Sequence, residues 1–160
     1  MLRRSTALAL LCATFLLGST ASPSWARATP EAGMVREINA VRTAHGLRTL
    51  RLSPSLRASA RRRSHLMLVR DVFAHFPSSA RSFSPIGEVI AIKRGWRPGA
   101  AVTVSRWMRS PPHRAVLLYP SLRYVGPGQA RGRFQGRRAT TWVVRVGGQR
   151  RSSRRRAPRR

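Results

Sequence analysis

The two ends of this chain cannot take part in a packed core, and they therefore limit which residues can fold. The first 28 residues carry two arginines ahead of an apolar run, followed by small residues that include Ala26-Arg27-Ala28. This order is typical of a cleaved export signal, and the run is shorter than the roughly 20 apolar residues of a membrane helix. From Gln149 onward the chain reads QRRSSRRRAPRR, without a large apolar side chain. We predict one folded domain, residues 29–148, between a signal peptide (1–28) and a disordered Arg-rich tail (149–160).

Basic residues outnumber acidic residues by 32 to 4, which gives a net charge of +28. With so few acids, a mechanism that needs two close carboxylates, such as that of a glycosidase, has few candidate pairs. The single cysteine, Cys12, lies in the signal peptide. The exported domain is therefore expected to be stable without disulfides and to lack a thiolate nucleophile.

The expected tail is the most basic part of the chain. Arginine forks pair with phosphate and carboxylate groups, and a strongly positive segment attracts polyanions. For a secreted protein the accessible polyanions are acidic wall polymers, anionic lipids and extracellular nucleic acid, whereas intracellular nucleic acid is in the wrong compartment. We predict polyanion binding by the tail; the alternative is a segment that only adds solubility. The predicted contacts are its seven arginines, Arg150, Arg151, Arg154, Arg155, Arg156, Arg159 and Arg160.

Three segments have the start signals and apolar spacing of helices, and three have the composition of strands. Thr29-Pro30 and Ser53-Pro54 each place a capping residue before a proline, as helix starts do. Helices precede strands along the chain, so the predicted fold class is α+β. Gly126-Pro127-Gly128 and Gly147-Gly148 are interpreted as turns. We expect helices that run from Thr29 to Gly46, from Ser53 to about Arg70 and from Pro98-Gly99 to Pro111-Pro112, a strand or turn at 86–92, and strands at 124–126 and 140–146.

Six segments, taken in order, resemble one known family. They are INAVRTAHGLRTL, FAHF, IGEVI, RWMRSPPHRAVLL, YVGPG and TWVVRVGG. Their order and spacing resemble the CAP superfamily, also called the SCP domain, and in particular its cysteine-free secreted bacterial branch. The resemblance covers roughly Glu31 to Gly148. It implies a single-domain α-β-α sandwich with an open cleft.

The resemblance also implies which residues line that cleft. In the family a histidine after the second helix, the glutamate of a G-E-N turn and a histidine near the third helix fall on His75, Glu88 and His113 of this sequence. Ser110 occupies the position of a second glutamate in the animal and plant branches, and it is expected to contact ligand with the other three. Val89 replaces the asparagine of the G-E-N turn, and Arg63 stands where bacterial relatives often carry another histidine.

Two interpretations of these cleft residues remain open. Two imidazoles and one carboxylate could hold a divalent metal such as zinc and leave a position for water, as in a hydrolase. Alternatively, His75 and His113 are hydrogen-bonded cleft residues, and Glu88 offsets nearby arginine charge. Because no second carboxylate is available as a general base, the sequence favours binding over hydrolysis.

The expected function is that of a secreted, monomeric binding module at the cell envelope. Its cleft would take a small or lipidic ligand, and its tail would bind anionic envelope polymers or lipids. Two alternatives are a metal-dependent hydrolase that uses the same cleft and a cationic protein that acts on membranes through its charge alone.

Overall fold

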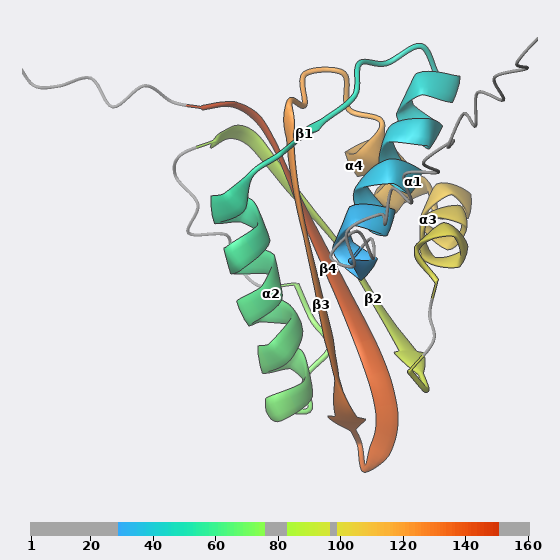
Figure 1. Ribbon diagram of the computed structural model, residues 1–160, viewed down its shortest axis with the longest axis vertical. Coiled ribbons are helices and arrows are strands. Elements are labelled where there is room, and N and C mark those ends of the chain that lie inside the picture. Colours follow the sequence, from blue (N-terminus) through green and yellow to red (C-terminus); the bar gives the residue numbers. More distant parts are fainter. Residues whose placement is uncertain (1–28, 76–82, 97–98, 151–160) are drawn as a thin grey trace, which may run out of the picture.

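The structure is a computed structural model that describes residues 29–75, 83–96 and 99–150 (Figure 1). The expected signal peptide and residues 151–160 of the expected tail lie outside the described residues. Among the described residues no helix is long and apolar enough to cross a membrane. The elements are, in order, α1 (Pro30–Ala44), β1 (Arg51–Leu52), α2 (Pro54–Val69), β2 (Phe83–Arg94), α3 (Ala100–Arg109), α4 (Pro111–Leu117), β3 (Tyr124–Phe134) and β4 (Arg137–Arg150).

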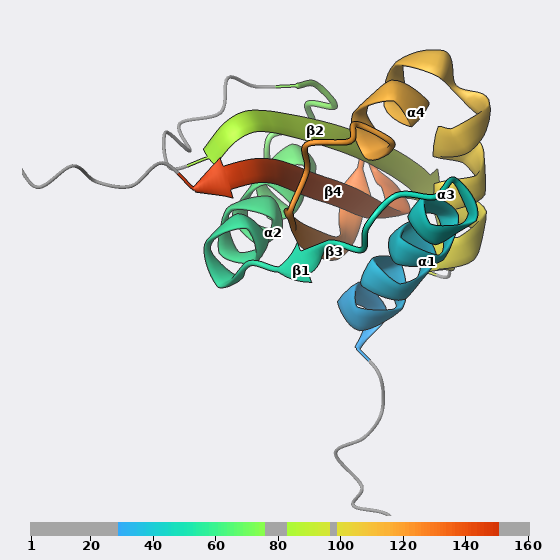
Figure 2. The same cartoon turned by 90° about the horizontal axis from the view of Figure 1, so that it is seen from above.

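The four strands form one mixed sheet in the order β1-β3-β4-β2. Strand β4 is antiparallel to both of its neighbours, and β1 runs parallel to β3. Helix α2 covers one face of the sheet, and α1, α3 and α4 lie on the other side (Figures 1 and 2). We call these the α2 face and the three-helix face. The predicted α+β class and α-β-α sandwich are confirmed.

The three-helix face carries the larger apolar core. Side chains from α1, α3 and α4 pack against alternate residues of β2 and β4, which point to the same side of the sheet. Trp107 also donates a hydrogen bond from Nε1 to the Ile90 carbonyl, at 3.0 Å. The core residues on this face are Met34, Ile38, Leu50, Val89, Val104, Trp107, Leu117, Leu122, Val125, Trp142, Val144 and Val146.

Both predicted helix starts are confirmed. The Thr29 hydroxyl accepts a hydrogen bond from the backbone N–H of Ala32 at 3.2 Å, and Ser53 does the same for Leu56 at 3.4 Å. Pro111-Pro112 was expected only to end a helix, and it also begins α4. Proline fits the first turn of a helix because the missing N–H has no intrahelical acceptor there.

The interpretation of the glycine pairs as turns is wrong. Gly126 and Gly128 lie inside β3, and Gly147 and Gly148 lie inside β4. A Cβ atom on Gly128 would be 2.2 Å from the backbone nitrogen of Arg61. Gly126 and Gly128 therefore allow the backbone of α2 to pack directly on the sheet, whereas Gly147 and Gly148 lie against Phe83, Ser84 and Pro85 of β2.

Strands β3 and β4 are much longer than expected. The Gly/Arg-rich segment between them belongs almost wholly to the strands, and only Gln135 and Gly136 form the turn, both with positive φ. Strand β4 also includes Gln149 and Arg150, which the sequence assigned to the tail. Alternating arginines are compatible with a strand because every second side chain can face solvent.

Candidate functional site

Glu88 lies on β2 directly opposite Arg145 of β4. Its Oε2 accepts a hydrogen bond from Arg145 Nε at 3.0 Å, and Arg145 Nη1 donates to the Ser59 hydroxyl of α2 at 2.6 Å. The side chains of Glu88 and Arg145 are 11% and 3% exposed. This buried ion pair ties two strands to the helix that covers them.

His75 follows α2 and contacts the other oxygen of the same carboxylate. The distance from His75 Nδ1 to Glu88 Oε1 is 3.2 Å, and the imidazole is 57% exposed. Arg63 of α2 also lies near this carboxylate. Burial and the charges of Arg145 and Arg70 lower the pKa of Arg63, and Glu88 opposes that shift. The single negative charge of Glu88 is therefore surrounded by basic groups.

His113 comes from the first turn of α4. Burial lowers its pKa, and the nearby charge of His75 lowers it further. The imidazole of His113 is therefore neutral at neutral pH. The structure joins His75 to Glu88 directly and brings His113 into electrostatic range of His75.

Ser110 is in hydrogen-bond contact with His113, with 2.8 Å between the hydroxyl and Nδ1. Ser110 is the N-cap and His113 the third residue of α4, but the Ser110 hydroxyl makes no capping hydrogen bond to a backbone N–H of the helix. The same pair also offers a hydroxyl and a neutral imidazole to a polar ligand.

The described residues contain no group of three or more His, Cys, Asp or Glu side chains that could hold a metal ion. Both oxygens of Glu88 are engaged, one by His75 and one by the buried Arg145. A dication at this carboxylate would also lie close to the positive charges of Arg145 and Arg63. These contacts favour a hydrogen-bonding role for Glu88, and metal binding by His75, Glu88 and His113 stays a prediction.

Two arginines that the sequence analysis did not single out are important for the fold. Arg145 is the first, and an arginine in an otherwise apolar strand is a signal that a buried partner is required. Arg42 is the second, fully buried at the end of α1. It donates to the carbonyls of Leu117 and Tyr119 at the end of α4, at 2.7 and 3.2 Å. Among the seven predicted polyanion contacts, Arg150 is the last residue of β4, and the other six lie outside the described residues.

Comparisons with known proteins agree with this architecture. The family model described as CAP, the cysteine-rich secretory protein family, matches residues 35–146. No curated protein matches the chain.

Several solved structures share the fold. An outer surface protein from Borrelia burgdorferi is 20% identical with a TM-score of 0.59, and the match covers 74% of this chain and 90% of that one. An extracellular SCP-domain protein from Bacillus anthracis is 20% identical with a TM-score of 0.57, and the match covers 74% of this chain and 41% of that one. The venom allergen-like protein 4 of Schistosoma mansoni is 11% identical with a TM-score of 0.57, with 78% and 90% covered. By its family match over most of the folded domain, this chain belongs to the CAP family.

Proposed function

We propose that this protein is exported and acts as an extracytoplasmic binding module at the cell envelope. The family match and the fold shared with an outer surface protein and an extracellular protein support this location. The ligand contacts are proposed to be His75, Glu88, Ser110 and His113, and the basic segment after β4 is proposed to bind anionic polymers or lipids.

The hydrogen bonds of Glu88 carry the preference for binding over catalysis. A general base must have a carboxylate oxygen available for the proton that it removes. Here one oxygen is bonded to a buried arginine and the other to His75. Releasing Glu88 would leave Arg145 without its carboxylate partner in a buried position, which is costly. A polar ligand can instead contact His75, Ser110 and His113 while the ion pair stays intact.

A thermal-shift titration tests this assignment against the metal-dependent hydrolase. A ligand that binds only the native state raises its melting temperature. We expect that binding of Zn²⁺, Mg²⁺ or Ca²⁺ to His75, Glu88 and His113 does not raise the melting temperature. A rise specific to Zn²⁺ that disappears in His75→Ala/His113→Ala, but persists in the control His45→Ala/His65→Ala, would establish the metal site and favour the hydrolase.

The role of the tail is tested by neutralising its charge at constant length. Replacing the six arginines after Arg150 with glutamine leaves β4 unchanged. We expect the variant to lose salt-sensitive binding to isolated cell envelopes, because its electrostatic attraction is removed. Unchanged envelope binding by this variant would contradict the proposed role of the tail in attaching the protein to the envelope. Dye release from anionic vesicles by the unmodified protein would instead support the membrane-active alternative.

A further inference from the structure

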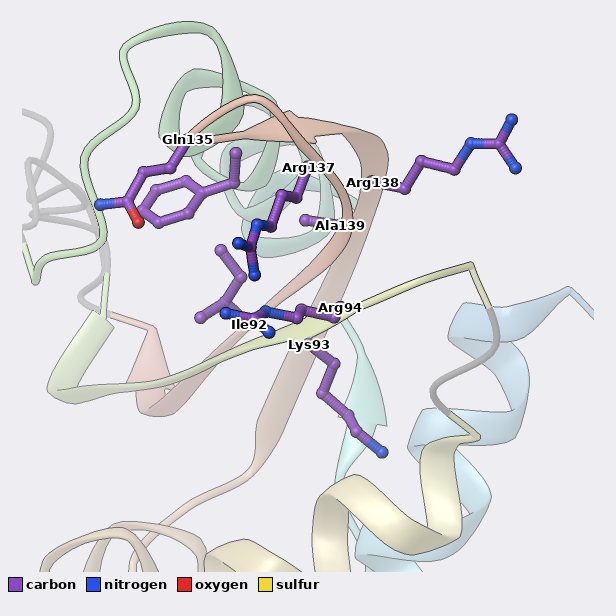
Figure 3. Close-up of a pocket in the computed structure, with 8 residues that line it drawn as sticks. Ile92, Lys93, Arg94, Gln135, Arg137, Arg138 and Ala139 are labelled. Atoms are coloured by element: carbon purple, nitrogen blue, oxygen red, sulfur yellow. The ribbon is translucent and has the colours of Figure 1, made fainter.

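A hollow of about 480 Å³ opens at the end of the sheet where β3 turns into β4 (Figure 3). It shares no lining residue with the site described above. Ile92, Phe134 and Ala139 give it an apolar lining, and Arg94 and Arg137 give it charge. The chemistry of this hollow is therefore separate from that of the Glu88 site.

The register of the sheet places both arginines in the same hollow. Arg94 of β2 pairs with Ala139 of β4, and Arg137 lies two residues before Ala139. Alternate residues of a strand share a face, so Arg94 and Arg137 project from the same side of neighbouring strands. Figure 3 shows their guanidinium groups turned toward one another.

The charge of this pair is not balanced by a protein carboxylate. Among the described residues no acidic side chain forms an ion pair with Arg94 or Arg137. Asp71 is the acid bound to this hairpin, and its carboxylate accepts a hydrogen bond from the backbone N–H of Gln135 at 2.5 Å. Two guanidinium groups that face one another repel. An anion bound between them would attract both, and the net electrostatic energy of the three groups would become favourable.

Further cations lie on the opposite side of the same sheet end. Lys93 and Arg138 also line the hollow, but their side chains extend away from Arg94 and Arg137 (Figure 3). The guanidinium of Arg138 lies 4.8 Å from the ring centre of Trp96, which is 49% exposed. The hairpin end thus presents a pair of exposed arginines that line the hollow, with two more cations around it.

We propose that this hairpin end binds a phosphodiester polymer, with Arg94 and Arg137 clamping one phosphate in the hollow. Arginine forks match phosphate geometry and bind it through two parallel hydrogen bonds. Because the two guanidinium groups face into a recess, they suit a group that enters it better than a flat layer of lipid headgroups. Lys93 and Arg138 attract neighbouring phosphates of the same chain. The inference rests on the proposed function in one respect, that the exported protein meets anionic envelope polymers.

The hairpin site and Arg150, after which the basic segment begins, lie at opposite ends of β4. Arg137 begins β4 and Arg150 ends it (Figure 1). At about 3.3 Å per residue the two ends are roughly 40 Å apart along the strand. A long polymer can contact both sites at once and gain affinity from the second contact, whereas a short one cannot.

The experiment measures the dissociation constant of poly(glycerol phosphate) for the exported protein. In Arg94→Gln/Arg137→Gln we expect it to rise about tenfold, with a shallower salt dependence, because both arginine contacts to the clamped phosphate are lost. The control Arg48→Gln/Arg62→Gln removes the same charge from two exposed positions outside the hollow and is expected to change binding about twofold at most. Arg94→Lys/Arg137→Lys keeps the positive charge but loses the forked guanidinium group. Its dissociation constant should lie between those of the Arg94→Gln/Arg137→Gln variant and the control.

Comparing a short polymer with a long one separates binding by the hairpin site from binding by the tail. A short polymer should bind the tail-neutralised protein normally and the hairpin variant poorly, and only a long polymer should respond to both changes. Equal losses in the hairpin variant and the control would overturn the proposal, as would loss of short-polymer binding on neutralising the tail alone. Binding to phosphatidylglycerol vesicles without binding to the polymer would overturn it in favour of a lipid surface. Circular dichroism spectra of all variants confirm that they are folded.

Discussion

The two faces of the sheet are held to their helices by different means. The three-helix face is packed with large apolar side chains, including Trp107 and Trp142. The α2 face has a smaller apolar cluster of Ala60, Met67, Ile90 and Val143, and Leu56 and Leu68 of α2 are also buried. Its other contacts are the close approach of α2 to the glycines of β3 and a buried polar network.

This difference explains why Glu88 and Arg145 lie on the α2 face, whereas Ser110 and His113 belong to the start of α4 on the other side of the sheet. Buried polar groups require partners, and the network around Glu88 supplies them from three elements. Ser64 and Thr141 extend it, with 2.8 Å between their hydroxyl oxygens. The apolar face stabilises the domain, and the polar face positions chemical groups at the edge of the sheet.

The largest expected effect comes from filling the contact between α2 and β3. In Gly128→Val the new side chain would meet the backbone of Ala60 and Arg61, which no rotamer change can move. We expect the free energy of unfolding to fall by more than about 4 kcal/mol, measured by urea denaturation. The control Gly99→Ala, where a Cβ would meet no atom within 4 Å, should cost less than about 1 kcal/mol. A similar loss of unfolding free energy in both variants would show that the close contact between α2 and Gly128 of β3 does not hold α2 on the sheet.

The next effect separates the ion pair from ordinary packing. Arg145→Met leaves Glu88 buried without its main partner and should cost about 3 to 5 kcal/mol. Replacing both members in Glu88→Met/Arg145→Met should restore much of that stability, because no buried charge remains unpaired. A double variant as unstable as the sum of the single variants would contradict this account of the α2 face.

Truncating a core side chain measures how much apolar packing on the three-helix face contributes to the free energy of unfolding. Ile38 is fully buried among α1, α3 and the sheet, and Ile38→Ala should cost about 3 kcal/mol through the cavity that it leaves. The smaller truncation Ile38→Val removes a single methylene and should cost about 1 kcal/mol. If both changes were neutral, the three-helix face would not be the main apolar support of the domain.

The smallest effect is the pH dependence contributed by His113. Its pKa in the folded protein is lowered from 6.5 by burial and by His75. Above pH 6.5 both the folded and the unfolded states hold a neutral imidazole, and the group has no effect. As the pH falls below that value, the unfolded state binds the proton first, so stability decreases. Comparing unfolding free energies of the unmodified protein and His113→Gln across this range should show a smaller acid loss in the variant.

The sequence predicted the helices better than the strands. Helix starts at Thr29 and Ser53 are local signals, since a capping side chain and the next proline are adjacent in the chain. The glycines of β3 were misinterpreted because the helix that needs them lies some 70 residues earlier. Turn propensity is a local property, whereas close packing of a helix on a strand depends on tertiary structure.

The candidate site was predicted in part for the same reason. The resemblance identified His75 and Glu88, which the structure brings into contact. It did not identify Arg145 as the partner of Glu88, because that pairing depends on the register of β2 against β4. The hairpin hollow was also missed, since its arginines come together only when both strands extend well beyond their apolar segments.

The central place of β4 has a consequence for how this domain acquires its structure. Strand β4 is the last element of the fold and lies between β3 and β2, so β2 reaches the rest of the sheet only through it. While residues 137–150 are still missing from a growing chain, β2 has no partner strand and α2 lacks its contacts with β4. The sheet can therefore be completed only after nearly the whole domain has been synthesised.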